Sequence, residues 1–100
     1  MKGLIIAESW ISLIISGEKT WEMRSRNTRI RGRIGLIRKG SKTVVEVADL
    51  VDTLTELSPA TLGAKVVKHQ VPTERIGNDY KYRFAWVLNG ARPLREPVAV

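Results

Sequence analysis

The chain contains no cysteine and a single histidine, His69, among its 100 residues. The lack of cysteine excludes disulfide bonds, thiol nucleophiles and cysteine metal sites. One histidine cannot build a zinc site by itself, because such sites need three or four protein ligands. We therefore expect a protein that uses no metal and no cofactor.

Long hydrophobic runs are also absent. The first ten residues, MKGLIIAESW, contain a short apolar run that is interrupted by Glu8. This run is too short for the hydrophobic region of a signal peptide, and far too short to span a bilayer. We expect a cytoplasmic protein with no membrane partner.

The overall composition is that of an ordinary globular protein, with 43% hydrophobic and 27% charged residues. A chain of this length can bury a core without metals or cross-links, but it leaves no room for a second domain. The sequence therefore predicts a single domain over residues 1–100 that folds alone, as a monomer.

Acidic residues are scarce relative to basic ones. Seventeen Lys and Arg stand against ten Asp and Glu, which gives a net charge of +7. Nine of the basic residues lie between Lys19 and Lys42, where Glu22 is the only acid. This asymmetry predicts one basic face, as in nucleic-acid-binding proteins. A basic, solvated surface without a ligand would show the same pattern.

The spacing of apolar residues predicts mostly strands, with one amphipathic helix near the start. Residues 10–16 carry apolar side chains at helical spacing, and Gly17 is expected to end this helix. A short helix should begin at Ser58-Pro59, with serine as cap and proline in the first turn. Residues 65–79 show no readable periodicity. Strands are expected at residues 4–7, 20–24, 29–38, 43–51 and 80–88, with a turn at Asn89-Gly90.

This order of elements predicts an α+β, mostly β fold: a small, strongly bent sheet or barrel whose ends are covered by helices. Along the strand at 29–38, alternation places arginines on the outer face. These arginines and their basic neighbours are the predicted phosphate contacts, namely Arg26, Arg29, Arg31, Arg33, Lys39 and Lys42.

Three charged residues are expected to converge where the first helix gives way to a strand. Lys19 lies at the junction, and Glu22 and Arg24 project from one face of the strand about 6.6 Å apart. One interpretation is an ion pair on a solvated strand face. The other is a pocket in which two cations and one carboxylate hold a polar, anionic or base-like ligand.

The segment around these residues resembles the ASCH (activating signal cointegrator homology) domains of the PUA-like superfamily. The signature G-x-K-x-x-E-x-R of that family is present in full from Gly17 to Arg24. A helix bearing Trp10 precedes it, Ser25 follows it, RGRIGLI lies at the expected distance, and AWVL leads to ARPL near the carboxyl end. The resemblance covers nearly the whole chain.

The resemblance implies a small β-barrel with a cleft between the barrel and the first helix, lined by Lys19, Glu22 and Arg24. ASCH domains are associated with RNA or DNA binding. We therefore predict a domain that binds nucleic acid, with RNA as the first candidate. A nucleoside or nucleotide is the other predicted ligand. Trp10 and Ser25 are further ligand-binding candidates, with Trp10 either stacking a base or belonging to the core.

A hydrolase is the alternative that the resemblance leaves open. A related small group of proteins hydrolyses the acetyl amide of N4-acetylcytidine, with a lysine at the position of Lys19 and a nucleophilic threonine at the position of Glu22. In an amidohydrolase or a ribonuclease of this kind, Lys19 would act as general base and Glu22 would have to activate water. The glutamate in place of threonine favours binding over hydrolysis.

Overall fold

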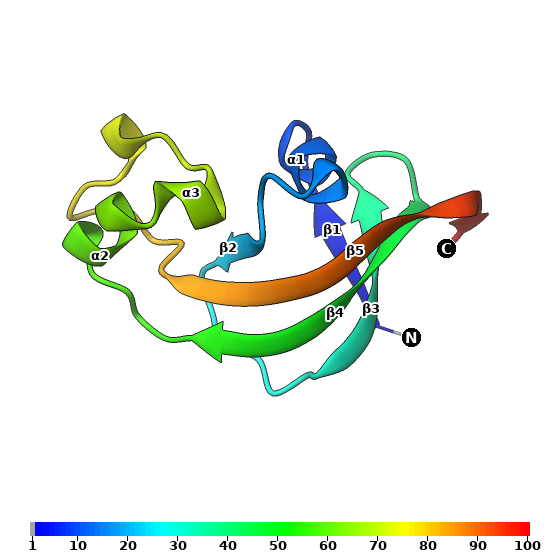
Figure 1. Cartoon of the computed structure of the whole chain (residues 1–100), viewed down its shortest axis with the longest axis horizontal. Coiled ribbons are helices and arrows are strands. Elements are labelled where there is room, and N and C mark those ends of the chain that lie inside the picture. Colours follow the sequence, from blue (N-terminus) through cyan, green and yellow to red (C-terminus); the bar gives the residue numbers. More distant parts are fainter. Residues whose placement is uncertain (1) are drawn as a thin grey trace.

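The computed structural model describes residues 2–100 and shows a five-stranded, strongly curved sheet that forms a half-barrel (Figure 1). The strand order is β1-β3-β4-β5-β2, with β1 parallel to β3 and the other neighbours antiparallel. This architecture confirms the predicted fold class. The strands are β1 (Lys2–Ile6), β2 (Trp21–Arg24), β3 (Gly32–Arg38), β4 (Thr43–Leu54) and β5 (Phe84–Ala99).

Helix α1 (Trp10–Ser16) packs on the sheet, as the apolar spacing predicted. It ends at Gly17, whose φ of 84° lies in the left-handed region that glycine adopts without strain. Helix α2 (Pro59–Ala64) begins as predicted, because the Ser58 side chain accepts a hydrogen bond from the Thr61 N–H. Two short elements, α3 (Val66–His69) and η1 (Thr73–Arg75), lie with α2 at one end of the sheet (Figure 1).

The core consists of two clusters of buried side chains. One lies between α1 and the sheet and includes Ile11, Ile14 and Leu36. The other includes Met23 and Leu62 and joins α2 to β2. Trp10 packs against both clusters, so the first residue of α1 stands at the junction between the barrel and its helical end.

The strand predicted over residues 29–38 begins later, at Gly32. The Arg31 guanidinium donates hydrogen bonds to the carbonyl oxygens of Thr28 and Ile30, at 3.2 and 2.7 Å. Because β3 begins at Gly32, Arg29 and Arg31 lie in the loop before it and not on the outer face of a strand. The rest of the prediction is confirmed, since Ile34 and Leu36 are buried.

The last strand differs from its prediction at both ends. It starts at Phe84 rather than at residue 80. It also runs through Asn89-Gly90 to Ala99, so the prediction of a turn at Asn89-Gly90 was wrong. Pairing with the twelve-residue β4 keeps β5 extended. The glycine, with a φ of 62°, lies next to a register shift in that pairing, so the irregularity is absorbed as a bulge and not a turn.

Among residues 2–100, no helix is long and apolar enough to cross a membrane. The same residues contain no group of three or more His, Cys, Asp or Glu side chains arranged to hold a metal ion.

Candidate functional site

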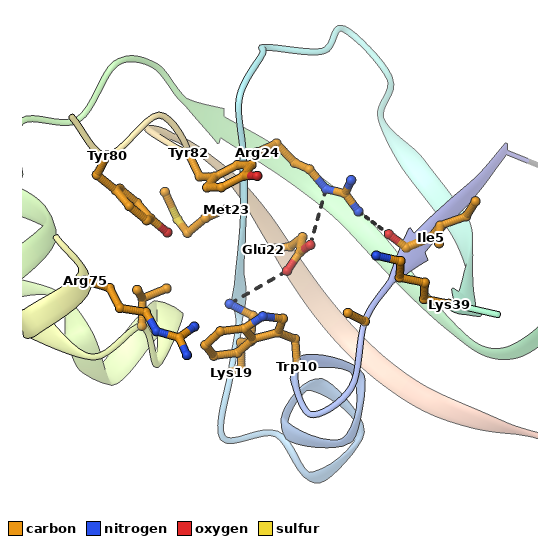
Figure 2. Close-up of a pocket in the computed structure, with 12 residues that line it drawn as sticks. Ile5, Trp10, Lys19, Glu22, Met23, Arg24, Lys39, Arg75, Tyr80 and Tyr82 are labelled. Carbon is orange, nitrogen blue, oxygen red and sulfur yellow. Dashed lines mark hydrogen bonds and ion pairs between the residues drawn. The ribbon is translucent and has the colours of Figure 1, made fainter.

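A cavity of about 680 Å³ opens between the two edge strands of the half-barrel (Figure 2). Ile5 of β1 lines one side, and Glu22, Met23 and Arg24 of β2 line the other. The two edges are linked directly, because Arg24 Nη2 donates a hydrogen bond of 2.6 Å to the carbonyl oxygen of Ile5. The unpaired edges of the sheet thus form a cleft instead of an open surface.

Lys19 lies beneath this cleft and is only 3% exposed. Its Nζ donates to the carbonyl oxygens of Trp21 and His69, at 2.7 and 2.6 Å, and lies 3.8 Å from Glu22 Oε1. The Trp10 ring covers the ammonium, with its centroid 4.9 Å away. An ammonium group has three N–H donors. All three are directed at the protein, so Lys19 holds Glu22 and the backbone in place.

Glu22 stands between two cations in the middle of the cleft (Figure 2). Its Oε2 lies 3.3 Å from Arg24 Nε, and the residue is 7% exposed. Burial raises the pKa of the Glu22 carboxyl, while Lys19 and Arg24 oppose that rise. Burial likewise lowers the pKa of Lys19, to about 8, against the attraction of Glu22. The predicted pair therefore joins a buried Glu22 to a half-buried Arg24 at a cavity, unlike an ion pair on a solvated strand face.

A third wall of the cleft, on the side of Glu22 away from Ile5 (Figure 2), comes from residues that the sequence did not identify. Arg75 of η1 and the two tyrosines at 80 and 82 line the cavity and face Glu22 across it (Figure 2). Tyr80 and Tyr82 pack edge to face with ring centroids 5.7 Å apart, and burial raises the pKa of Tyr80. These tyrosines were assigned to a strand, and the segment before them had no periodicity that would have placed it at the cleft.

His69 fixes the position of this wall relative to Lys19. Its ring is fully buried; Nε2 donates to the Leu62 carbonyl oxygen at 2.7 Å, and Nδ1 accepts from the Val71 N–H at 2.9 Å. Burial lowers the pKa of His69, so the neutral ring with its proton on Nε2 fits both contacts. The carbonyl of the same residue accepts from Lys19, which ties α3 to β2.

The predicted phosphate contacts are dispersed in the structure. Lys39 lines the cleft, whereas Arg26, Arg29, Lys42 and the ligand candidate Ser25 are exposed outside the set of residues that line it. Arg31 lies 4.0 Å from Asp52 and donates to Thr53.

Arg33 of β3 stands opposite Asp49 of β4 in the strand register. Acidic residues of β4 therefore lie beside the arginines of β3 and the loop before it, and they offset part of the predicted basic face. Trp10, Lys19, Glu22, Arg24 and Lys39 are the predicted site residues that the structure brings together.

Comparisons with known proteins agree with this architecture. The crystal structure of ASCH from Zymomonas mobilis superimposes with a TM-score of 0.76 at 20% identity, covering 98% of this chain and 72% of that one. A tyrosine-to-phenylalanine mutant of that protein gives 0.74 at 21% identity, with coverage of 100% and 77%. No curated protein sequence matches with significance. The family model described as the ASCH domain matches residues 4–96. The chain therefore belongs to the ASCH domain family.

Proposed function

We propose that the cleft binds one nucleotide of a single-stranded nucleic acid, with RNA as the preferred polymer. The observation that carries this proposal is the chemistry of the lining. Four cations, one carboxylate and three aromatic rings surround a single cavity: Lys19, Arg24, Lys39, Arg75, Glu22, Trp10, Tyr80 and Tyr82. Aromatic rings stack on bases, and cations bind phosphates, so this lining suits both parts of a nucleotide.

Lys39 and Arg75 are the groups that we assign to phosphates. They lie on opposite sides of the cleft (Figure 2). Within the described part of the chain, neither has a carboxylate within ion-pair distance. Their charges are therefore available to a ligand, in contrast to those of Arg31 and Arg33, which lie beside acids of β4.

A single strand fits this cleft better than a duplex does. The cavity admits a base only if that base is unstacked and turned out of the chain, which unpaired nucleotides allow at little cost. Tyr82 is 41% exposed and lines the cavity, so part of its side chain is accessible to a base. The association of ASCH domains with RNA or DNA supports the same class of ligand.

The salt dependence of binding tests this proposal. Replacing Lys39 and Arg75 together by alanine should weaken binding of a fluorescent oligoribonucleotide and lower the log–log salt slope by about 1.4, because each lost phosphate contact removes about 0.7. Fluorescence anisotropy at several salt concentrations measures both quantities. The matched control is Arg31→Ala with Arg33→Ala, which removes the same charge away from the cleft and should change the slope less. Equal slopes in the two double variants would contradict a specific role for the cleft cations.

A hydrolase remains the second candidate, because burial lowers the pKa of Lys19 to about 8. A general base must lose a proton near neutral pH, and this shift is in the direction that such a role needs. The three contacts of the ammonium group favour the positioning role. We expect no acetate release from N4-acetylcytidine. Acetate release that disappears in Lys19→Arg, with the fold intact, would replace the binding proposal by the hydrolase.

A further inference from the structure

Glu22 is the one negative charge among the described residues that line the cleft. Every other charged group there is a donor only, because Lys and Arg side chains have no acceptor. A carboxylate repels phosphate, so in a site for an anionic ligand it has to face a part of the ligand that carries N–H donors. In a nucleotide, that part is the edge of the base.

The carboxylate retains two open acceptor positions. One cation approaches each oxygen, Lys19 at Oε1 and Arg24 at Oε2. A carboxylate has about four lone-pair sites, so each oxygen can accept at least one more hydrogen bond. The strand pairing of Glu22 with Trp86 on β5 and the two flanking cations fix the direction of the side chain.

Arg24 stands beside Glu22 without using up its acceptors. Its Nε lies 3.3 Å from Glu22 Oε2 but makes no hydrogen bond within residues 2–100, and its Nη2 donates to the carbonyl oxygen of Ile5. The guanidinium is planar, which keeps its nitrogens at fixed spacing. Along this side, the cleft presents the two oxygens of the Glu22 carboxylate as adjacent acceptors.

Guanine is the base with the complementary edge. Its amino group and its N1–H are adjacent donors, and O6 beside them is an acceptor. Adenine and cytosine each place one donor next to an acceptor, and uracil has a single N–H between two carbonyls. We propose that the cleft selects guanine, with the Glu22 carboxylate accepting from N1–H and the amino group. This inference rests on the proposed function of the same cleft.

Free nucleotides test the base preference without any variant. Isothermal titration calorimetry with GMP, IMP, AMP, CMP and UMP should show GMP binding at least tenfold more tightly than AMP, CMP and UMP, because a bidentate base contact discriminates by about this much. IMP lacks the amino group and should bind about tenfold more weakly than GMP, since a hydrogen bond to a charged group is lost. Equal affinities of GMP and IMP, or five affinities within threefold of each other, would overturn the proposal.

The variant Glu22→Gln separates base recognition from a structural role. Its amide replaces one acceptor by a donor, which fits cytosine or adenine better than guanine. We expect GMP affinity to fall at least tenfold and CMP or AMP to bind as tightly as GMP. Glu18→Gln is the matched control, because Glu18 is exposed outside the cleft and its replacement removes the same charge. An unchanged GMP preference in Glu22→Gln would refute the assignment, and if this variant does not fold, the IMP comparison decides.

Oligonucleotides separate this inference from the proposed function. An oligouridylate with one central guanine should bind more tightly than the all-uridine chain, by the same factor as GMP over UMP. If both oligomers bind equally, base selection is wrong and the nucleic-acid proposal stands. If GMP binds selectively but neither oligomer binds, guanine selection holds for the free nucleotide and the nucleic-acid proposal fails. If none of these ligands binds, both fail.

Discussion

Replacing Lys19 by methionine should lower the free energy of unfolding by about 3–5 kcal/mol, as is typical when one partner of a buried ion pair is removed. Methionine keeps the length of the side chain but leaves the carbonyl oxygens of Trp21 and His69 without their donor. It also leaves Glu22 buried with only Arg24 beside it. Urea denaturation followed by circular dichroism measures the loss.

Two further variants identify the cause. Lys68→Met removes the same charge from an exposed lysine of α3, and it should change stability by less than about 0.5 kcal/mol. Adding Glu22→Gln to Lys19→Met should recover part of the loss, because the buried carboxylate is then gone. If Lys19→Met is no more destabilising than Lys68→Met, the ammonium does not hold the cleft together.

The stability of the protein should fall as the pH rises from about 4.5 to 7, by about 3 kcal/mol from Glu46 alone. Glu46 lies on β4, is completely buried, and has no hydrogen-bond partner for either carboxyl oxygen within the described residues. Its neighbours in register are Leu36 on β3 and Pro93 on β5, which offer no side-chain donor. Burial raises the pKa of this carboxyl to about 7.

The direction follows from proton linkage. The folded state holds the Glu46 proton more tightly than the unfolded chain, whose carboxyl has a pKa of 4.5. The stabilisation that this proton provides is complete below pH 4.5 and is lost as the pH rises through 7. Above that pH, Glu46 causes no further change in stability. A tenfold change in proton affinity corresponds to about 1.4 kcal/mol, which sets the size of the effect.

Glu46→Gln isolates this contribution, because the amide does not titrate. The difference in unfolding free energy between the parent and this variant should change by about 3 kcal/mol between pH 4 and 8. His69 is present in both proteins, so its contribution cancels in this comparison. Its lowered pKa makes stability rise with pH below pH 6.5, which is opposite to the effect of Glu46. Asp52→Asn is the matched control, since Asp52 is an exposed acid of the same strand. A parallel pH dependence of the parent and Glu46→Gln would show that Glu46 does not carry the effect.

The spacing of the motif has a structural explanation. Gly17 ends α1, and the Lys19 N–H then donates to the carbonyl oxygen of Leu13, which leads the chain back toward the helix and leaves the lysine side chain under Trp10. Glu22 and Arg24 lie two residues apart on β2 and therefore point to the same side. The lysine holds the glutamate, and the glutamate and arginine face the cavity.

Local periodicity and capping residues were sufficient to predict several elements. The apolar spacing of residues 10–16 with Gly17 predicted α1, the alternation around Glu22 predicted β2, and Ser58-Pro59 predicted the start of α2. Each of these signals lies within a few residues, where side-chain spacing and capping chemistry act directly on the backbone. The family motif identified the first half of the cleft for the same reason, because its residues are contiguous.

The other half of the cleft was decided only by tertiary structure. Lys19 and the His69 carbonyl oxygen are 50 residues apart, and the contact between them exists only after α3 has packed against β2. Arg75 reaches the cleft from a segment with no regular pattern, and Tyr82 reaches it from residues that were predicted to be part of a strand. Pairing with β4 likewise carried β5 through Asn89-Gly90. Local sequence patterns show the structural preferences of short segments. This wall depends instead on contacts between residues far apart in the sequence, which form only when the whole chain has folded.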